Sequence, residues 1–262
     1  MSNQAGMFQT LTPSPRRQSD LVAPRQANQT NLKTQRGFKS LTPLELLGPL
    51  NDVERKYAPS NLFVAGPIGV PLPQPRVAIV GSRHASAKGL DAASHIARVL
   101  SRRGVVVVSG LAEGIDTAAH TATIENGGQT IAVLGTPLNR VYPRKNLQLQ
   151  QTIMANHLAV SQFPSGYPVQ PKNFVIRNRT MALISNASII VEAGETSGSL
   201  HQGWEALRLG RPLFMWKPLV GESGLSWPKR MMRYGALELN DPKRIFEVLP
   251  STRKIEQIAI QI

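Results

Sequence analysis

Residues 77–100 read VAIVGSRHASAKGLDAASHIARVL, and this stretch decides the fold class. The run from Val77 to Val80 is apolar and β-branched, which is typical of a strand buried on both faces. Gly81 allows a tight exit from that strand, and the next segment has the spacing of an amphipathic helix. Backbone N–H groups at the start of such a helix attract an anion, and Arg83 would add a bidentate donor. These residues equally allow Ser82 or Ser86 to cap the helix, with Arg83 as a solvated charge.

The alternation of strand and helix continues as far as residue 250. Apolar runs begin at residues 77, 105, 130, 158, 188 and 212, and the segments between them have helical periodicity. Continuous apolar runs indicate strands covered on both faces, and helical crossovers imply parallel pairing. The sequence therefore predicts an α/β fold, with a doubly wound, mostly parallel, Rossmann-like sheet over residues 76–250.

The remainder of the chain is divided by composition. Residues 1–40 are rich in Gln, Ser, Thr and Pro, and their charged side chains are mainly Lys and Arg. Such a segment buries too little apolar area to offset its ordering entropy, so we expect a disordered basic arm. Residues 41–75 are predicted to be a lead-in segment, and residues 251–262 a short tail.

The charge balance favours a polyanionic partner. The chain has 30 Lys and Arg against 16 Asp and Glu, a formal net charge of +14, and binding to phosphates begins with electrostatic attraction. It has no cysteine, which excludes disulfides and thiolate metal sites, and its five histidines lack ligand spacing. No apolar run approaches the roughly 20 residues that span a bilayer. We therefore expect a cytoplasmic protein with no membrane contact, no metal and no cofactor.

In a doubly wound sheet, ligands bind beyond the carboxyl ends of the strands. The segments that follow these ends here are rich in Gly, Ser, Arg and Lys. Phe174 lies between Lys172 and the run Arg177-Asn178-Arg179, a mixture of basic and aromatic residues typical of a platform for a single nucleic acid strand. By themselves these residues also allow Phe174 to fill the core beneath its loop, and the arginines to lie on a solvated helix face.

Seven blocks of the chain resemble, in order and spacing, the DNA-processing protein A family (DprA, also called Smf). They are GSR at 81, SGLAEGIDTAAH at 109, TIAVLG at 130, YPRKN at 142, NFVIRNR at 173, VEAGETSGSL at 191 and GRPLF at 210. The resemblance implies an extended Rossmann fold that binds single-stranded DNA without catalysis. It also implies protection of incoming DNA, help in loading the RecA recombinase during natural transformation, and a homodimer. The apolar tail IEQIAIQI and the edge at residues 213–216 support dimerisation.

The resemblance also implies which residues contact DNA. Its phosphate pocket falls on Gly81, Ser82, Arg83, Ser109, Gly110, Ser197, Gly198 and Ser199. Its base-stacking and basic residues fall on Lys172, Phe174, Arg177, Asn178 and Arg179. Two positions depart from the family pattern, since Ser161-Gln162 and Phe174-Val175 replace the usual Ser-Glu and Phe-Pro. No N-terminal helical domain is recognisable in residues 1–50, and too few residues follow Pro250 for a winged helix, so we expect a minimal, Rossmann-only version.

A second class of protein stays open, namely a nucleotide-sensing or phosphoribohydrolase-like module of the same superfamily. Those hydrolases carry a PGGxGTxxE loop whose glutamate acts in cleavage of the glycosidic bond. Gln202 stands at that position here, and an amide is no general acid or base. Glu205, one helical turn further on, could substitute. Asp116 and His120 could form a catalytic pair, although we expect Asp116 to support the start of a helix and His120 to pack or hydrogen-bond locally.

Overall fold

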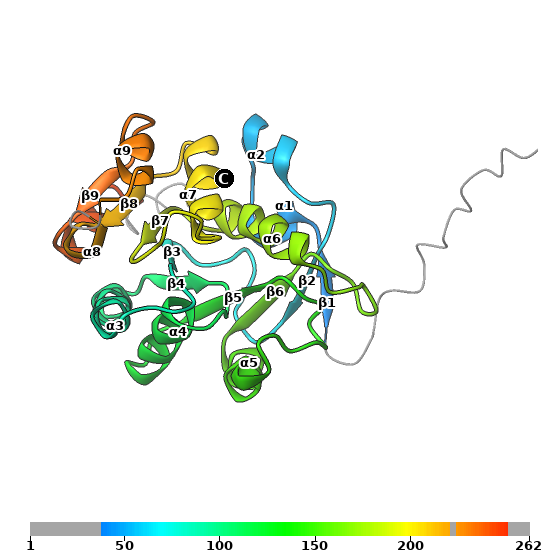
Figure 1. Cartoon of the computed structure of the whole chain (residues 1–262). Coiled ribbons are helices and arrows are strands. Elements are labelled where there is room, and N and C mark those ends of the chain that lie inside the picture. The colour runs from blue at the N-terminus through cyan, green and yellow to red at the C-terminus, as the bar shows by residue number, and fades with distance from the viewer. Residues whose placement is uncertain (1–37, 221–223, 251–262) are drawn as a thin grey trace, which may run out of the picture. The chain divides into compact units, whose positions relative to one another are not determined.

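The computed structural model describes residues 38–220 and 224–250, and Figure 1 shows them as helices around one sheet. The sheet has nine strands in the order β1-β2-β6-β5-β4-β3-β7-β8-β9. All neighbouring strands are parallel except in the pairs β1–β2 and β2–β6. The predicted fold class, a mostly parallel and doubly wound α/β sheet, is confirmed.

The apolar runs found in the sequence form the centre of this sheet. They are β3 (Arg76–Val80), β4 (Val106–Ser109), β5 (Thr130–Leu134), β6 (Leu158–Ser161), β7 (Ala187–Ile190) and β8 (Leu213–Trp216). Every residue of these strands is buried, which explains why the runs are continuous and do not alternate. The sequence patterns did not predict the outer strands β1 (Lys39–Leu41), β2 (Leu62–Ala65) and β9 (Leu237–Leu239), which are only three or four residues long.

Residues 41–75, interpreted from the sequence as a lead-in, contribute to the same sheet. Strand β2 pairs antiparallel with β6, with Val64 opposite Val160. Two short helices, α1 (Pro43–Leu47) and α2 (Asp52–Tyr57), lie between β1 and β2 and begin with capping boxes, Thr42 with Glu45 and Asn51 with Glu54. The sheet therefore begins before Arg76.

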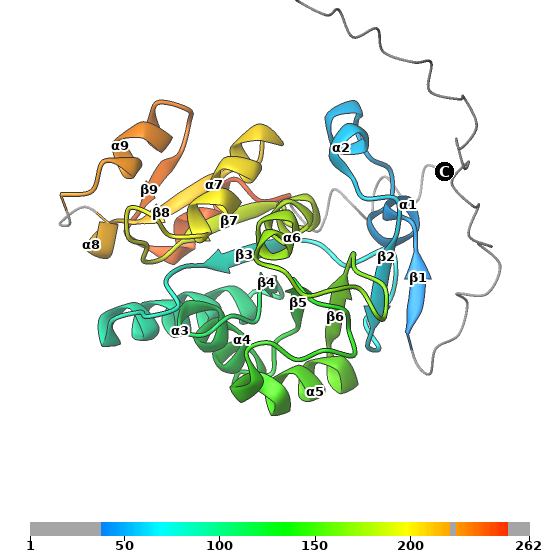
Figure 2. The same cartoon turned by 45° about the vertical axis from the view of Figure 1, so that its right-hand side comes forward.

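Helices cover both faces of the sheet (Figure 2). On one face lie α3 (Ala87–Ser101), α4 (Ile115–Glu125) and α5 (Leu147–Asn156), and on the other α6 (Pro171–Ile184) and α7 (Ser199–Arg208). The remaining helices are α8 (Lys217–Val220) and α9 (Trp227–Met232), with 3₁₀ turns at η1 (Arg144–Asn146) and η2 (Pro242–Glu247). This arrangement leaves the ends of the parallel strands free to carry a site.

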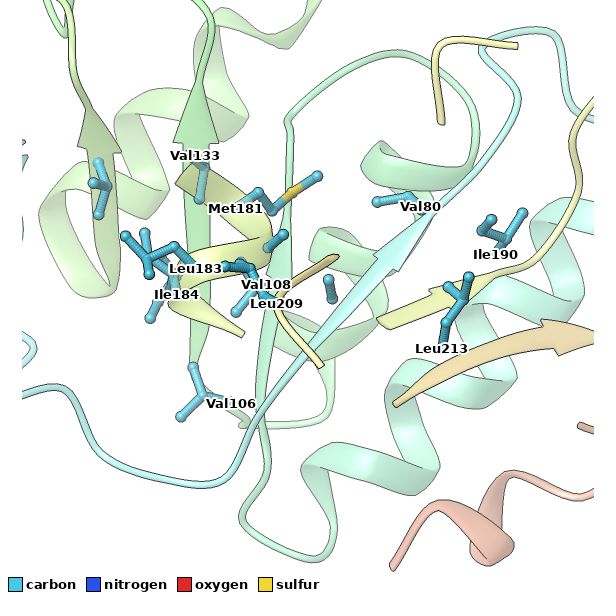
Figure 3. Close-up of a cluster of buried hydrophobic side chains, with 14 of the residues drawn as sticks. Val80, Val106, Val108, Val133, Met181, Leu183, Ile184, Ile190, Leu209 and Leu213 are labelled. Carbon is cyan, nitrogen blue, oxygen red and sulfur yellow. The ribbon is translucent and has the colours of Figure 1, made fainter. Parts of the chain in front are cut away.

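The core that fixes α6 on the sheet is apolar throughout (Figure 3). Met181, Leu183 and Ile184 on the last turns of α6 pack over Val108 and Val133 of the strands, and each of these side chains is at most 2% exposed. Burial of one such side chain contributes about 1.5–3 kcal/mol. The C-terminal half of α6 is anchored in this way. Its N-terminal half is therefore held in a fixed position near the carboxyl ends of the strands.

Both ends of the chain extend beyond the residues that the structure describes. The predicted basic arm, residues 1–40, lies outside the described residues as far as residue 37, and the prediction is wrong for Lys39 and Ser40, which belong to strand β1. The tail from residue 251 also lies outside the described residues. The predicted sheet edge at residues 213–216 is wrong, because β8 lies between β7 and β9 and is buried. Within residues 38–220 and 224–250, no helix has both the length and the apolar character needed to cross a membrane.

Candidate functional site

The strand order reverses direction between β3 and β7. Strands β4, β5 and β6 follow β3 on one side, whereas β8 and β9 follow β7 on the other. At such a switch point the two following loops diverge and leave a crevice at the carboxyl ends of the strands. A cavity of about 760 Å³ opens there, between the loops after β3 and β7 and the first half of α6.

The cavity brings together most of the predicted binding residues. Nine of them line it: Gly81, Ser82, Arg83, Phe174, Arg177, Asn178, Ser197, Gly198 and Ser199. The other four, Ser109, Gly110, Lys172 and Arg179, are not part of its lining.

The start of α3 is not an open anion site. Ser86 caps this helix through its hydroxyl, which accepts a hydrogen bond from the Gly89 N–H at 3.0 Å. The Glu192 carboxylate also lies there, accepting the Ser86 N–H at 3.1 Å and the Ser86 hydroxyl at 2.8 Å. A protein carboxylate therefore already occupies the place where the sequence suggested an external anion. An anion in the cavity must instead be attracted by Arg83 and the loops.

Arg83 brings a positive charge to the cavity. Its side chain is exposed and lines the cavity mouth, and it forms no ion pair within the described part of the chain. Its guanidinium carbon lies 5.6 Å from the centroid of the Phe174 ring, within the range of a cation–π contact. This contact holds the guanidinium beside the aromatic ring and leaves its N–H groups available for a ligand.

Phe174 and Tyr142 form an aromatic pair at the cavity wall. Their ring centroids are 5.1 Å apart, and the rings are tilted by 49°. Phe174 lies so close to Gly135 that a Cβ atom at position 135 would be 2.5 Å from its Cδ1 atom. Gly135 is therefore required for the ring's position, while Tyr142 is 48% exposed. Tyr142 was not among the residues predicted to bind, although it stands in the block YPRKN.

Arg177 is buried, with 5% of its surface exposed, and it does not lie on a solvated helix face. Its Nη1 atom donates hydrogen bonds to the carbonyl oxygens of Gly110 and of Val133, the latter at 2.8 Å, and its Nε donates to Asn178 Oδ1 at 3.0 Å. Burial lowers the pKa of this guanidinium below its usual value. Arg177 thus joins the ends of β4 and β5 to α6 and supports the cavity floor.

Asn178 connects that floor to the turn before α7. Its Nδ2 donates to the Gly198 carbonyl oxygen at 3.0 Å. In the same turn, the hydroxyls of Ser197 and Ser199 are 2.7 Å apart and hydrogen-bonded to each other. Ser197 and Ser199 line the cavity, so their hydroxyls are placed where they can contact phosphate oxygens.

The four predicted binding residues that do not line the cavity contact other parts of the protein or lie on its surface. The Ser109 hydroxyl donates to the Ile79 carbonyl at 2.7 Å, and Gly110 has the Arg177 guanidinium at its carbonyl. Lys172 is exposed on the first turn of α6. Arg179 lies 3.6 Å from Glu205 and is directed toward α7. Ser109 and Gly110 are therefore structural supports, and Arg179 belongs to a different surface from Arg177.

Among the described residues that line the cavity, Asp116 is the one carboxylate. It accepts the N–H groups of Gly110 at 3.1 Å and of Ala112 at 3.3 Å. Burial raises its pKa above the usual value, an effect that the nearby Arg177 opposes. His120 is fully buried, and its Nδ1 is hydrogen-bonded to Thr130 Oγ1 at 2.7 Å. The expected local roles of Asp116 and His120 are confirmed, because each bonds neighbouring protein groups.

The two residues considered for hydrolysis, Gln202 and Glu205, are bonded to other protein groups, although Gln202 lines the cavity. Gln202 is fully buried, and its Nε2 donates to the Ser188 hydroxyl at 3.1 Å. Glu205 forms ion pairs with Arg179 and Arg208 and is not among the lining residues. The Gln202 position therefore brings no general acid or base to this cavity.

A doubly wound sheet with a cavity at its switch point defines a class, the Rossmann-like proteins, in which ligands bind beyond the carboxyl ends of the strands. The chain belongs to one family of that class, the DNA recombination-mediator protein A family, whose sequence profile matches residues 48–250.

The relatives found by sequence comparison are named DNA processing proteins. The chain is 34% identical over 192 residues to the DNA processing protein DprA of Bacillus subtilis, covering 73% of this chain and 65% of the relative. It is 40% identical over 177 residues to DprA of Streptococcus pneumoniae, covering 68% and 62%. The chain therefore spans somewhat less than two thirds of the length of these two relatives.

Solved structures agree with the fold. The X-ray structure of DprA from Streptococcus pneumoniae superimposes with a TM-score of 0.71 at 33% identity, covering 82% of this chain and 75% of that one. DprA from Helicobacter pylori, in a structure that concerns its single-stranded DNA binding mode, gives a TM-score of 0.69 at 24% identity, covering 80% and 94%. At that identity the second structure supports the fold alone.

Proposed function

We propose that this protein binds single-stranded DNA in the cavity between β3, β7 and α6. Phosphates contact Arg83 and the Ser197–Ser199 turn, and an unpaired base stacks on the aromatic pair Phe174 and Tyr142. Arg177 and Asn178 hold the walls of this site in place. Lys172 adds positive charge at the first turn of α6.

The observation that carries this proposal is the contact between Arg83 and Phe174. Arg83 is exposed, has no carboxylate partner among the described residues, and lies 5.6 Å from the centroid of an aromatic ring that also lines the cavity. A cation beside a stacking surface matches one repeating unit of a single strand, a phosphate next to a base. A closed duplex hides its base faces and offers only its phosphates to the same site.

The relatives support this reading. The relatives from Bacillus subtilis and Streptococcus pneumoniae are named DNA processing proteins, which supports DNA as the ligand. The Helicobacter pylori protein, for which the likeness shows the fold alone, is described by its own single-stranded DNA binding mode. The family description, recombination mediator, supports a role in which the bound strand is protected and passed to a RecA-type recombinase. We therefore propose that the protein acts in DNA processing, as in natural transformation, and that it performs no catalytic turnover.

We also propose a homodimer, and the C-terminal edge of the sheet supports it. Strand β9 is the last strand of the sheet, and edge strands offer unpaired backbone groups to another chain. Exposed apolar side chains gather in the segment around β9, with exposures of 44% for Met232, 69% for Tyr234 and 48% for Leu237. Light scattering tests this directly, and a monomer at all concentrations would remove it.

Fluorescence anisotropy with labelled ligands tests DNA binding. The expected result is tighter binding to a single strand than to a duplex of the same length, with affinity falling as salt rises. Equal affinity for the two forms would contradict the proposal. Saturable binding of a mononucleotide, with no gain for an oligonucleotide, would instead support the nucleotide-sensing alternative.

A further inference from the structure

A second groove adjoins the cavity. It has a volume of about 450 Å³, and its lining includes Arg83 and His84, which also line the first cavity. The rest of its lining comes mainly from α3 and α4, together with Lys145. A ligand at Arg83 therefore has two spaces open to it, one toward α6 and one between α3 and α4.

The groove exists because small side chains line it where α3 and α4 pack together. Ser94 on α3 and Ala118 and Thr121 on α4 are among them, and all three are only partly buried. Leu90, on the second turn of α3, is 37% exposed and forms an apolar part of the lining. The hydroxyls can donate hydrogen bonds to phosphate oxygens, and the exposed apolar side chain can pack against a sugar or a base.

We propose that a single strand bound in the first cavity continues past Arg83 into this groove, which is a second subsite for the same strand. This inference rests on the proposed function. The second subsite gives the bound strand a path, from the Phe174 side of Arg83 to the Lys145 side. It also implies a minimum strand length, below which the second subsite stays empty.

The charges along this path favour a polyanion at its near end. Arg83 has no ion-pair partner within the described residues, and Lys145, 61% exposed, lies 2.5 Å from Glu113. An exposed ion pair of this kind contributes only about 0–1 kcal/mol, so a phosphate can replace Glu113 at little cost. Glu125, the last residue of α4, is the one acid among the described residues that line the groove. It marks the far end, where a further phosphate would be repelled.

The loop between the two spaces is held by the body of the protein. The Ser82 N–H donates to the Glu192 carbonyl at 2.7 Å, and the Ser82 carbonyl accepts the Ile115 N–H at 3.2 Å. A Cβ atom at Gly114 would lie 2.3 Å from that same carbonyl oxygen, so α4 begins directly against the loop. Arg83 therefore stands on a fixed ridge between the two subsites.

Oligothymidines of two lengths test the inference, about 4 and about 16 nucleotides, the range of site sizes on single-strand binding folds. Lys145→Glu reverses a charge in the groove, and Thr121→Tyr fills it. Lys88→Glu is the matched control, because Lys88 is an exposed lysine of α3 that lines neither space. We expect Lys145→Glu and Thr121→Tyr to weaken binding of the long strand by about tenfold and of the short strand by less than about twofold. Lys88→Glu should have the smaller, uniform effect of a distant charge.

Two results would overturn the inference: equal losses for both lengths, or no loss for either. If the short strand binds too weakly to measure, the salt dependence of the long strand decides. Lys145→Gln should then make the slope of log K against log salt shallower by about 0.7, and an unchanged slope contradicts a phosphate at Lys145. If the unaltered protein fails to bind the long strand, the proposed function fails. If it binds and the groove variants behave as the control does, only the second subsite fails.

Discussion

The Nη1 atom of Arg177 lies 2.8 Å from the carbonyl oxygen of Val133, so the first arginine of the RNR block is bonded to a strand end and does not reach into solvent. A buried guanidinium with protein acceptors organises a site without neutralising a phosphate. Arg179, two residues further along α6, has a side chain that is 44% exposed and faces Glu205. The two arginines of one short block therefore have different roles.

Arg177→Ala should destabilise the fold, whereas Arg179→Ala should not. Removal of Arg177 leaves the buried carbonyls of Gly110 and Val133 without this donor, with a cost of about 3 kcal/mol in the free energy of unfolding. Removal of Arg179 breaks a partly exposed ion pair, with a cost of less than about 1 kcal/mol. Urea denaturation of the two variants measures the difference. Similar stabilities for both would place Arg177 among ordinary surface residues.

Arg83→Ala should weaken single-strand binding by a similar factor for every base sequence, because phosphate contacts carry no base information. The slope of log K against log salt should become shallower by about 0.7. Thermal stability should stay unchanged, because the Arg83 side chain is exposed and forms no ion pair within the described residues. A large fall in melting temperature would show that Arg83 is structural.

Loss of either aromatic ring should reduce affinity without changing the salt dependence. Phe174→Ala and Tyr142→Ala should each cost about 1–3 kcal/mol of binding free energy, because stacking releases no counterions. Tyr142→Phe keeps the ring and should bind as the unaltered protein does. If Tyr142→Ala binds normally while Phe174→Ala does not, the base contacts Phe174 alone.

Gly135→Ala should impair binding through Phe174. The new Cβ atom would lie 2.5 Å from the Phe174 Cδ1 atom, so the ring must move away from its place beside Arg83. Gly194→Ala is the matched control, because Gly194 also lines the cavity and a Cβ atom there has no neighbour within 4 Å. We expect lower affinity for the first variant and little change for the second. Equal affinities for the two variants would show that the ring position is unimportant.

Stability should fall as the solution becomes acidic, in part because of His120. Burial lowers the pKa of this imidazole from 6.5 to about 3, so the folded protein keeps it neutral. Between these two pH values the unfolded chain binds the additional proton, and the free energy of unfolding therefore decreases as the pH falls, by up to about 1.4 kcal/mol per pH unit. His120→Asn should show a weaker dependence between pH 6.5 and pH 3 in urea denaturation. The raised pKa of Asp116 acts in the opposite sense, and it is present in both proteins.

The continuous apolar runs were enough to predict the fold class. Val77, Val107 and Ile189 are fully buried in parallel strands, as those runs indicated. A strand that is apolar at every position buries all of its side chains only where both faces of the sheet are covered. The local sequence is therefore enough to indicate a sheet with helices on both faces. Strands β1 and β9 were missed because each has only three residues and is mostly exposed. Strand β2 is as long as β4 and nearly as buried, but it lies in the segment interpreted as a lead-in, and its pairing is set by the strands beside it.

For the site, the strand pattern was enough to identify the segments that follow the strand ends, and hence to predict that Gly81–Arg83, Ser197–Ser199 and the first half of α6 could converge. The role of each side chain there became visible only in the folded chain. Arg177 and Arg179 are the same residue type, but they point to different sides of α6. The carbonyl oxygens that accept hydrogen bonds from Arg177 belong to residues 110 and 133, which are far away along the chain. Burial, charge partners and ring contacts are properties of the assembled strand ends. No local pattern encodes them, because each depends on residues brought together by the sheet.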